Sequence, residues 1–172
     1  MDKRSVQRSW YFIGIQGLVL IYLFCACKNQ NSNDWVNKVL YFDNQQLRTQ
    51  YILHSIQEVK SIEKLPLKFE DEAGLAYQLN LDPNTTAEIS YFRSIEDTTY
   101  KVIAFSVNIF FAQEKQAIEI YKSFENHFQK LYGVFDGTFG NQEWIIPDIN
   151  YRITLKLQNQ KKEILITCSS IS

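Results

Sequence analysis

Two hydrophobic periodicities alternate along most of the chain. Over residues 34–62, apolar residues recur at spacings of three and four without glycine or proline, which predicts helix. Asp34 is the expected cap of its first turn, and a break near residues 43–44 is expected to divide it in two. The clearest helix is predicted over residues 113–132, where one apolar stripe follows the helical period and Gly133 ends it.

A period of two, typical of strands, governs the remaining segments. Leu67 and Phe69 alternate with polar residues behind Pro66, which predicts an edge strand. Further strands are predicted over residues 75–81, 88–95, 100–111, 151–158 and 163–168, with hairpin turns over 96–99 and 159–162. Because each hairpin has one apolar and one polar face, the expected fold class is α+β: an antiparallel sheet with amphipathic helices packed on one face, in a single domain.

The start of the chain has the layout of a secretory signal. Residues 2–9 are net positive, residues 10–26 carry no charge, and residues 27–33 are wholly polar. The string Leu23-Phe24-Cys25-Ala26-Cys27 resembles the lipobox of bacterial lipoproteins, although Phe24 stands where that family prefers leucine. The resemblance implies that residues 1–26 are a signal segment and that Cys27 is lipidated.

The lipoprotein interpretation implies that the protein is located in the cell envelope. The protein would be anchored in a membrane through lipid and lie outside the cytoplasm, facing the periplasm or the cell surface. Residues 27–33 would be a polar tether of at most ~25 Å, and residues 34–172 the folded domain. Two alternatives stay open: an uncleaved anchor over residues 10–26, whose helical rise of about 25 Å is short for a bilayer, and secretion after an ordinary signal-peptide cut.

Composition and charge exclude several classes of protein. The chain has 172 residues, 45% of them hydrophobic and 15% aromatic, which suits one folded domain and not a disordered segment. The formal charge is −1, and residues 1–26 carry +2, so the remainder carries −3. A mildly acidic domain without a basic face is not expected to bind nucleic acid. Cys25, Cys27 and Cys168 are too few and too badly placed for a disulfide framework.

No catalytic, metal or nucleotide motif stands out, and no cofactor is expected. His54 and His127 are the two histidines, and each is expected on a helix surface, not in a metal site. Cys168 is expected to be a buried strand residue. The acidic run at residues 70–72 lacks the ligand spacing of a calcium loop and is expected to be a solvated turn.

One stretch with the composition of a loop could carry recognition. Residues 133–141 hold three of the six glycines, with Phe135, Phe139 and Trp144 in or beside them. Such aromatic residues either cover the end of the core or form a contact surface for a partner. Phe135, Phe139 and Trp144 are therefore the candidate partner contacts.

Two classes of function remain. The first is a non-catalytic binding module that holds a partner, with a protein in the envelope as one candidate and toxin neutralisation by an immunity-type lipoprotein as a specific version. The second is a hydrolase of envelope polymers that uses a pair of carboxylates, which the sequence does not identify. The absence of a catalytic motif favours the binding module.

The lipid anchor leads to a direct test. Cys27→Ala should release the protein from its membrane and abolish labelling with a fatty acid such as palmitate, because the acyl chains supply the membrane affinity. Metabolic labelling and membrane fractionation are the measurements, with Cys25→Ala as the control that keeps its label. Label that persists in Cys27→Ala would assign the lipid to another residue.

Overall fold

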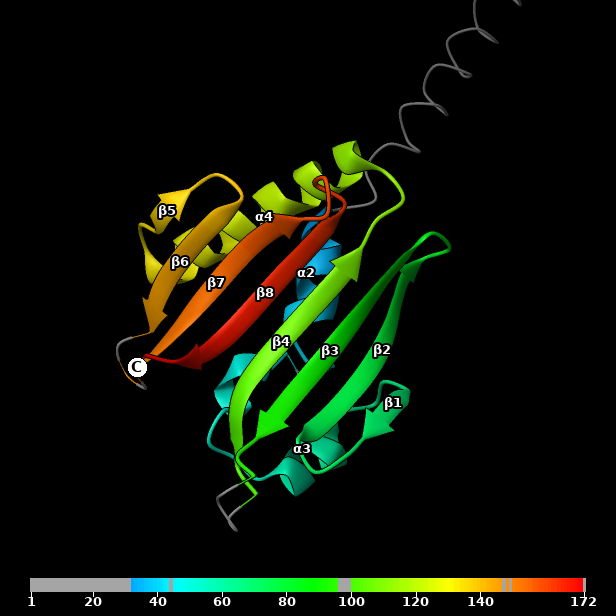
Figure 1. The fold of residues 1–172 in the computed structure, drawn as a ribbon, viewed down its shortest axis with the longest axis vertical. Helices are drawn as coiled ribbons and strands as arrows, with labels where there is room; N and C mark the ends of the chain where they lie inside the picture. The colour runs from blue at the N-terminus through cyan, green and yellow to red at the C-terminus, as the bar shows by residue number, and fades with distance from the viewer. Residues whose placement is uncertain (1–31, 44, 96–99, 147, 149, 172) are drawn as a thin grey trace, which may run out of the picture. The chain divides into compact units, whose positions relative to one another are not determined.

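An antiparallel sheet and four helical segments make up the described part of the chain, which comprises residues 32–43, 45–95, 100–146, 148 and 150–171 of a computed structural model (Figure 1). The helical segments are α2 (Ser32–Leu40), the 3-10 helix η1 (Arg48–Tyr51), α3 (Ile56–Ile62) and α4 (Glu114–Tyr132). The strands are β1 (Leu67–Glu70), β2 (Gly74–Asp82), β3 (Thr85–Arg93), β4 (Val102–Phe110), β5 (Asp136–Thr138), β6 (Asn141–Ile146), β7 (Tyr151–Gln158) and β8 (Glu163–Ser170). Cys27 and the predicted signal segment lie outside the described residues.

The sheet consists of two meanders joined at its centre. Its eight strands follow the order β1-β2-β3-β4-β8-β7-β6-β5, and every neighbouring pair is antiparallel. Strands β1 to β4 form one meander, strands β5 to β8 form the other, and α4 is the connection between them (Figure 1). The predicted α+β class is confirmed at this level, and β1 occupies an edge as its proline suggested.

The strands bury alternate residues. On the neighbouring strands β3, β4 and β8, the paired residues Ile89, Val107 and Ile166 are each at most 1% exposed. In the view of Figure 1 the helices lie behind the sheet. Helix α4 contacts β6, β7 and β8, and α2 contacts β2 and α4. The core therefore fills the space between these helices and the apolar face of the sheet.

Helix α4 follows the predicted apolar stripe closely. Its buried residues are Ala117, Ile120, Tyr121, Phe124 and Phe128. Its first turn carries Glu114 and its last turn Lys130, which suits the partial charges of the helix ends. Gly133 follows with φ 83°, a positive value that glycine adopts easily because it has no Cβ atom. Leu131 follows Phe124 by seven residues and Phe128 by three, which is the spacing of the buried stripe, but it is 43% exposed.

The segment before the first strand differs in detail from its prediction. Helix α2 begins at Ser32, so Asp34 is not its cap but lies in its first turn and pairs with Lys38 at 2.8 Å. The predicted break is confirmed, since α2 ends at Leu40 and is followed by η1 and α3. His54 was expected in a helix but lies in the turn before α3, because Ser55 caps that helix.

The glycine-rich segment is a hairpin and not the predicted loop. Residues Asp136–Thr138 form edge strand β5, which pairs with the first half of β6. Gly137 has φ 109°, and a Cβ atom there would lie 2.3 Å from the carbonyl oxygen of Asn141. Glycine at this position is therefore required by close backbone contact between the two strands, which local composition did not indicate.

The core role of α4 can be measured. Phe124 is fully buried against its neighbours, so Phe124→Ala should lower the free energy of unfolding by about 3–5 kcal/mol in urea melts. Leu131→Ala on the same helix is the matched control and should cost less than about 1 kcal/mol, because its side chain is half-exposed. Equal losses for the two variants would contradict this assignment of the buried face.

Candidate ligand pocket

A cavity of about 730 Å³ opens between α2, the segment that leads to η1, the end of α3 and strand β2. This volume falls within the range of small-molecule sites in proteins. Its lining mixes apolar and charged side chains: Asn37, Lys38, Tyr41, Phe42, Asp43, Gln45, Arg48, Ile62, Glu63, Lys64, Leu65 and Leu79.

A buried polar cluster forms one wall of this cavity and continues beneath it. Arg48 comes from η1, Glu63 follows α3, and Tyr91 comes from the apolar face of β3. Arg48 Nη1 forms an ion pair with Glu63 Oε2 and donates to the Tyr91 hydroxyl at 3.1 Å. The Tyr91 hydroxyl in turn donates to Glu63 Oε2 at 3.2 Å. The side chains of Arg48 and Glu63 are only 4% and 2% exposed, so this ion pair is shielded from water.

The carboxylate of Glu63 is saturated with donors. Its Oε2 accepts from Arg48 and Tyr91, while its Oε1 accepts from the backbone N–H groups of Lys64 at 3.1 Å and Leu65 at 3.3 Å. A carboxylate offers about four lone-pair positions, and four donors occupy them here. Glu63 therefore has little capacity left to accept a proton from a substrate or to bind a cation.

The guanidinium of Arg48, in contrast, has donors that are not used in hydrogen bonds. Both of its polar contacts use Nη1, and its buried Nε has no acceptor among the described residues. Its charged plane also lies 4.5 Å from the ring centre of Phe42, which is a favourable cation–π geometry. Burial lowers the pKa of Arg48 and raises that of Tyr91. The cluster thus holds unused donors on a charged group that is already expensive to bury.

Two lysines that line the cavity, Lys38 and Lys64, are in exposed ion pairs. Lys64 Nζ lies 3.4 Å from Asp43 Oδ2, and both side chains are more than three-quarters exposed. Lys38 is also about half exposed and pairs with Asp34. Exposed pairs of this kind contribute little and are screened by salt. Both lysines can therefore exchange these partners for a ligand at small cost.

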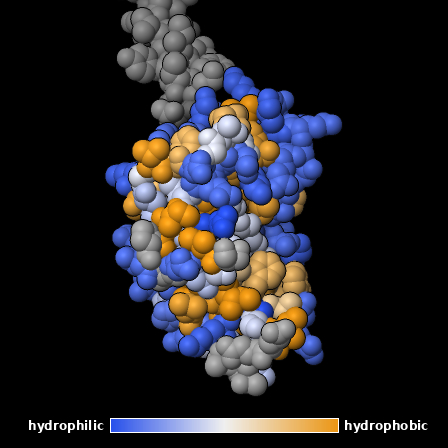
Figure 2. Space-filling model, turned by 60° about the vertical axis from the view of Figure 1, so that its left-hand side comes forward, coloured by the Kyte–Doolittle hydropathy of each residue, from blue (hydrophilic) through white to orange (hydrophobic). Residues whose placement is uncertain are grey.

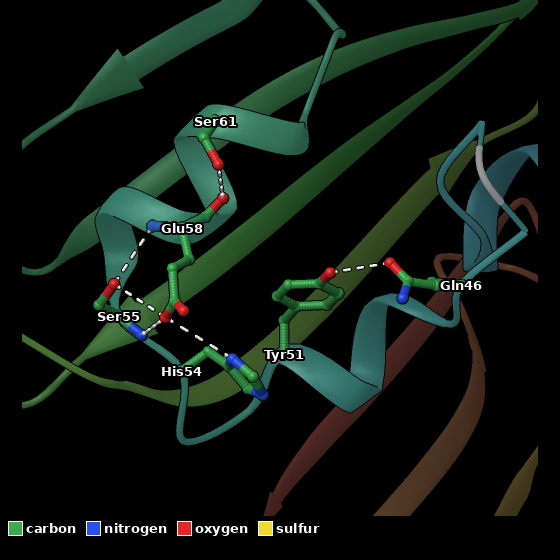
Figure 3. Close-up of polar contacts among 6 residues, drawn as sticks. All are labelled: Gln46, Tyr51, His54, Ser55, Glu58 and Ser61. Carbon is green, nitrogen blue, oxygen red and sulfur yellow. Dashed lines mark hydrogen bonds and ion pairs between the residues drawn. The ribbon is translucent and has the colours of Figure 1, made fainter.

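A second polar group contains the residue types of a catalytic triad but not its geometry (Figure 3). The carboxylate of Glu58 accepts from Ser55 Oγ at 3.0 Å and lies 3.6 Å from His54 Nδ1. In a working triad the histidine stands between the hydroxyl and the carboxylate, whereas here the carboxylate stands between the other two. Ser55 and Glu58 instead form a capping box at the start of α3, and the N–H of Ser55 lowers the pKa of Glu58.

The three candidate contact residues have different environments. Trp144 is 1% exposed, its Nε1 donates to the Gly133 carbonyl at 3.1 Å, and its ring packs on Phe128 and Phe135. Phe135 is partly buried against the core. Trp144 is therefore a core residue that a partner cannot touch, and Phe135 offers little surface. Phe139, at 52% exposure, is the candidate whose ring is open to a partner.

Tyr121 holds the hairpin that presents Phe139. The Gly140 N–H donates to the Tyr121 hydroxyl at 3.0 Å, and this hydroxyl donates to Gln142 Oε1 at 3.0 Å. The rings of Tyr121 and Phe139 meet edge to face with centres 5.1 Å apart. Burial raises the pKa of Tyr121 to about 12, so the hydroxyl keeps its proton at neutral pH. The exposed ring thus lies on a turn fixed to α4.

Exposed apolar side chains are scattered and do not select an interface by themselves. In Figure 2, hydrophobic residues occupy several areas separated by hydrophilic ones. Among the described residues, the most exposed large apolar side chains are Val134 at 88% and Ile95 at 73%. Isolated exposed apolar residues are usual on protein surfaces. The cavity, where shape and polar chemistry coincide, is therefore the stronger candidate site.

The remaining candidates from the sequence have structural roles. Nε2 of His127 lies 3.3 Å from the Tyr41 hydroxyl, and burial lowers the pKa of this histidine. Cys168 is buried, which raises its pKa to about 12 and makes it a poor nucleophile. Asp71 accepts from the N–H groups of Ala73 and Gly74 and so closes the turn after β1.

Within the described part of the chain, no group of three or more histidine, cysteine, aspartate or glutamate side chains is placed to hold a metal ion. None of its helices has both the length and the apolar character needed to span a bilayer.

Arg48, Glu63 and Tyr91 were missed at the level of sequence. Tyr91 is 43 residues from Arg48 and 28 from Glu63, so no local spacing connects them. One signal was present: Arg48 lies three and four residues before Tyr51 and Ile52, on the apolar stripe of the predicted helix. A charge on such a stripe indicates a buried partner elsewhere in the chain.

The fold and cavity define an α+β protein in which an eight-stranded antiparallel sheet supports a ligand-sized cavity beside a buried ion pair. No protein family model matches the sequence, and no curated protein and no solved structure matches the chain.

The two roles of the aromatic side chains can be separated by substitution. Trp144→Ala should lower the free energy of unfolding by about 3–5 kcal/mol, because it empties a filled site in the core. Phe139→Ala removes mainly an exposed ring and one edge contact, and should cost at most about 1.5 kcal/mol. Urea melts of both variants are the measurement. A loss of 3 kcal/mol or more in Phe139→Ala, on the order of a core substitution, would make this ring part of the core.

Proposed function

We propose that this protein is a lipid-anchored, non-catalytic binding module of the bacterial cell envelope, and that the cavity beside Arg48 holds its ligand. The anchor rests on the charge and hydrophobicity of residues 2–33 and on the resemblance of residues 23–27 to a lipobox. The module would work at the membrane surface, outside the cytoplasm, on a short polar tether.

One observation carries the binding role of the cavity. Its buried carboxylate, Glu63, has all of its acceptor positions occupied, while the buried guanidinium beside it has donors to spare. Such a wall can orient a ligand through hydrogen bonds but has no free acid or base to transform it. The volume of about 730 Å³ and the apolar side chains suit a small molecule.

The alternative of a polymer hydrolase finds less support. That chemistry needs two carboxyl groups facing one cleft, one to donate a proton and one to act as base or nucleophile. Asp43 and Glu63 are the carboxylates that line the cavity, and each is in an ion pair with a neighbouring cation. Because the acceptor positions of Glu63 are all occupied, the cavity does not offer the two free carboxyl groups that this chemistry needs.

A protein partner, including a toxin in the immunity-type version, is the second candidate. The exposed ring of Phe139 on a turn fixed by Tyr121 favours it. Such a partner would use the hairpin surface, which is separate from the residues that line the cavity. The two binding modes therefore predict different sensitive residues.

The ligand role can be tested on the full chain purified from solubilised membranes. Native mass spectrometry of the wild-type protein should show an added small-molecule mass that is absent from Leu79→Trp, because the larger ring occupies part of the cavity and obstructs the ligand. Leu131→Trp, on the exposed last turn of α4, is the matched control and should keep the added mass.

Two results would overturn the proposal. One is a wild-type protein without any added mass whose co-purifying protein partner is lost in Phe139→Ala. The other is cleavage of an envelope polymer by the wild-type protein that Asp43→Asn abolishes. The first result would support the protein-partner function, and the second would support the hydrolase.

A further inference from the structure

We infer that the ligand of this cavity is an anion with an apolar body: an organic carboxylate or phosphate ester whose charged group meets Arg48, Lys38 and Lys64. This inference rests on the proposed binding function and specifies its ligand class. The shared chemistry is a group that accepts several hydrogen bonds, carries negative charge and is attached to a hydrophobic portion. A soluble metabolite and a lipid headgroup would both satisfy it.

The first step is the balance of donors and acceptors in the buried cluster. Glu63 receives four hydrogen bonds or ionic contacts, and the Tyr91 hydroxyl both donates and accepts. Arg48 uses Nη1 in both of its polar contacts and leaves Nη2 out of them. Five N–H donors in a planar fork are suited to bidentate contact with carboxylate or phosphate. The missing partner of this cluster is therefore an acceptor and not a donor.

The second step is the charge around the cavity. Lys38, Arg48 and Lys64 line it, against the carboxylates of Asp43 and Glu63. Glu63 is neutralised by Arg48 and by two backbone N–H groups, which leaves the two lysines as the mobile charges. Their pairs with Asp34 and Asp43 are exposed and easily exchanged. The lining thus carries three cationic side chains against two carboxylates, and one of these, Glu63, has no acceptor position left, so the balance of charge favours an anion.

The third step is the apolar lining. Phe42, Ile62, Leu65 and Leu79 contribute hydrophobic side chains to the same cavity, and they come from three different segments of the chain. A small inorganic anion would leave this surface in contact with water. An organic anion would bury it, at roughly 25 cal/mol for each Å² removed from water. The cavity is therefore matched to an amphiphilic anion and not to inorganic phosphate alone.

Stability alone does not explain the cluster. A buried ion pair is on average no more stabilising than apolar side chains of the same volume. The unpartnered Nε of Arg48 adds a further cost. A chain that required only packing at this point would do as well with methionine, leucine and phenylalanine in place of Arg48, Glu63 and Tyr91.

The experiment measures binding of defined probes to the full chain in phosphatidylcholine nanodiscs by isothermal titration calorimetry, with empty discs subtracted. The probes are 4-phenylbutyrate, phenethyl phosphate, the neutral amide 4-phenylbutyramide, and inorganic phosphate. At least one organic anion should bind about tenfold or more tightly than the amide, because the amide lacks the charge-assisted contacts. Inorganic phosphate should bind more weakly than that organic anion.

Three variants assign the effect to residues. The triple variant Arg48→Met, Glu63→Leu, Tyr91→Phe replaces the whole cluster, leaves no buried charge, and should stay folded by circular dichroism while losing the preference for the anion. Lys64→Gln should weaken anion binding about two- to fivefold, because it removes one exposed charge and exposed charges contribute little. Lys122→Gln, at an exposed position of α4 away from the cavity, is the matched control and should leave binding unchanged.

The source of the anion is distinguished by repeating the titration in discs that contain phosphatidylglycerol. If a lipid headgroup occupies the cavity, probe affinity should fall in these discs and stay unchanged for the triple variant. If the natural ligand is soluble, affinity should be equal in both kinds of disc. Either result is compatible with an amphiphilic anion.

Several outcomes overturn the inference. These are equal binding of the acid and its amide, absence of binding by all of the organic probes, and undiminished anion preference in the folded triple variant. None of them removes the proposed binding function if the wild-type chain still carries an added mass that Leu79→Trp loses. A wild-type chain that carries no added mass would instead mean failure of the proposed function itself.

Discussion

The pairing of β4 with β8 is the contact on which the rest of this fold depends. The strands run antiparallel in register from Ala104 opposite Ser169 to Phe110 opposite Glu163, and they join two meanders that are each built from local connections. Since β5 lies at the far edge, the chain must cross the sheet between β4 and β5, and α4 makes that crossing. Its apolar stripe then covers the strands of the second meander. A shift of one residue in the β4–β8 register would turn the apolar side chains of one meander away from the helices.

The cavity follows from how unevenly the helices cover this sheet. Helix α4 is a long element with a continuous apolar stripe, whereas the first meander is covered by α2, η1 and α3, which are short and joined by turns. Side chains from several of these segments surround the cavity without filling it. Tyr91 contributes a hydroxyl from the sheet, and Arg48 and Glu63 approach it from two of these segments. The same local arrangement thus produces both the hollow and its polar wall.

The sequence predicted the elements whose partners are near in the chain. The hairpins of β3 with β4 and of β7 with β8 were predictable because alternation and turn residues act over a few positions. Helix α4 was predictable because its period continues over its full length. Alternation alone puts Ile103 on the same face as Phe105 and Val107, but it is 40% exposed because the register shifts by one residue opposite Phe92 and Arg93. A bulge of this kind depends on the neighbouring strand and leaves no mark on the alternation itself.

The candidate site was also predictable from the sequence only in part. The sequence by itself determined the α+β class, the hairpins, helix α4 and the aromatic character of the segment around Phe139, because each depends on a local period or composition. Only the tertiary structure decided that Trp144 is a core residue, that residues 136–138 are an edge strand, and that Arg48 and Glu63 meet at the cavity wall with Tyr91 bonded to both of them. The physical reason is that burial and ion pairing are relations between distant segments. The charge of Arg48 could be read from the sequence, but the carboxylate that neutralises it is brought near by the packing of η1 and the end of α3 against the sheet.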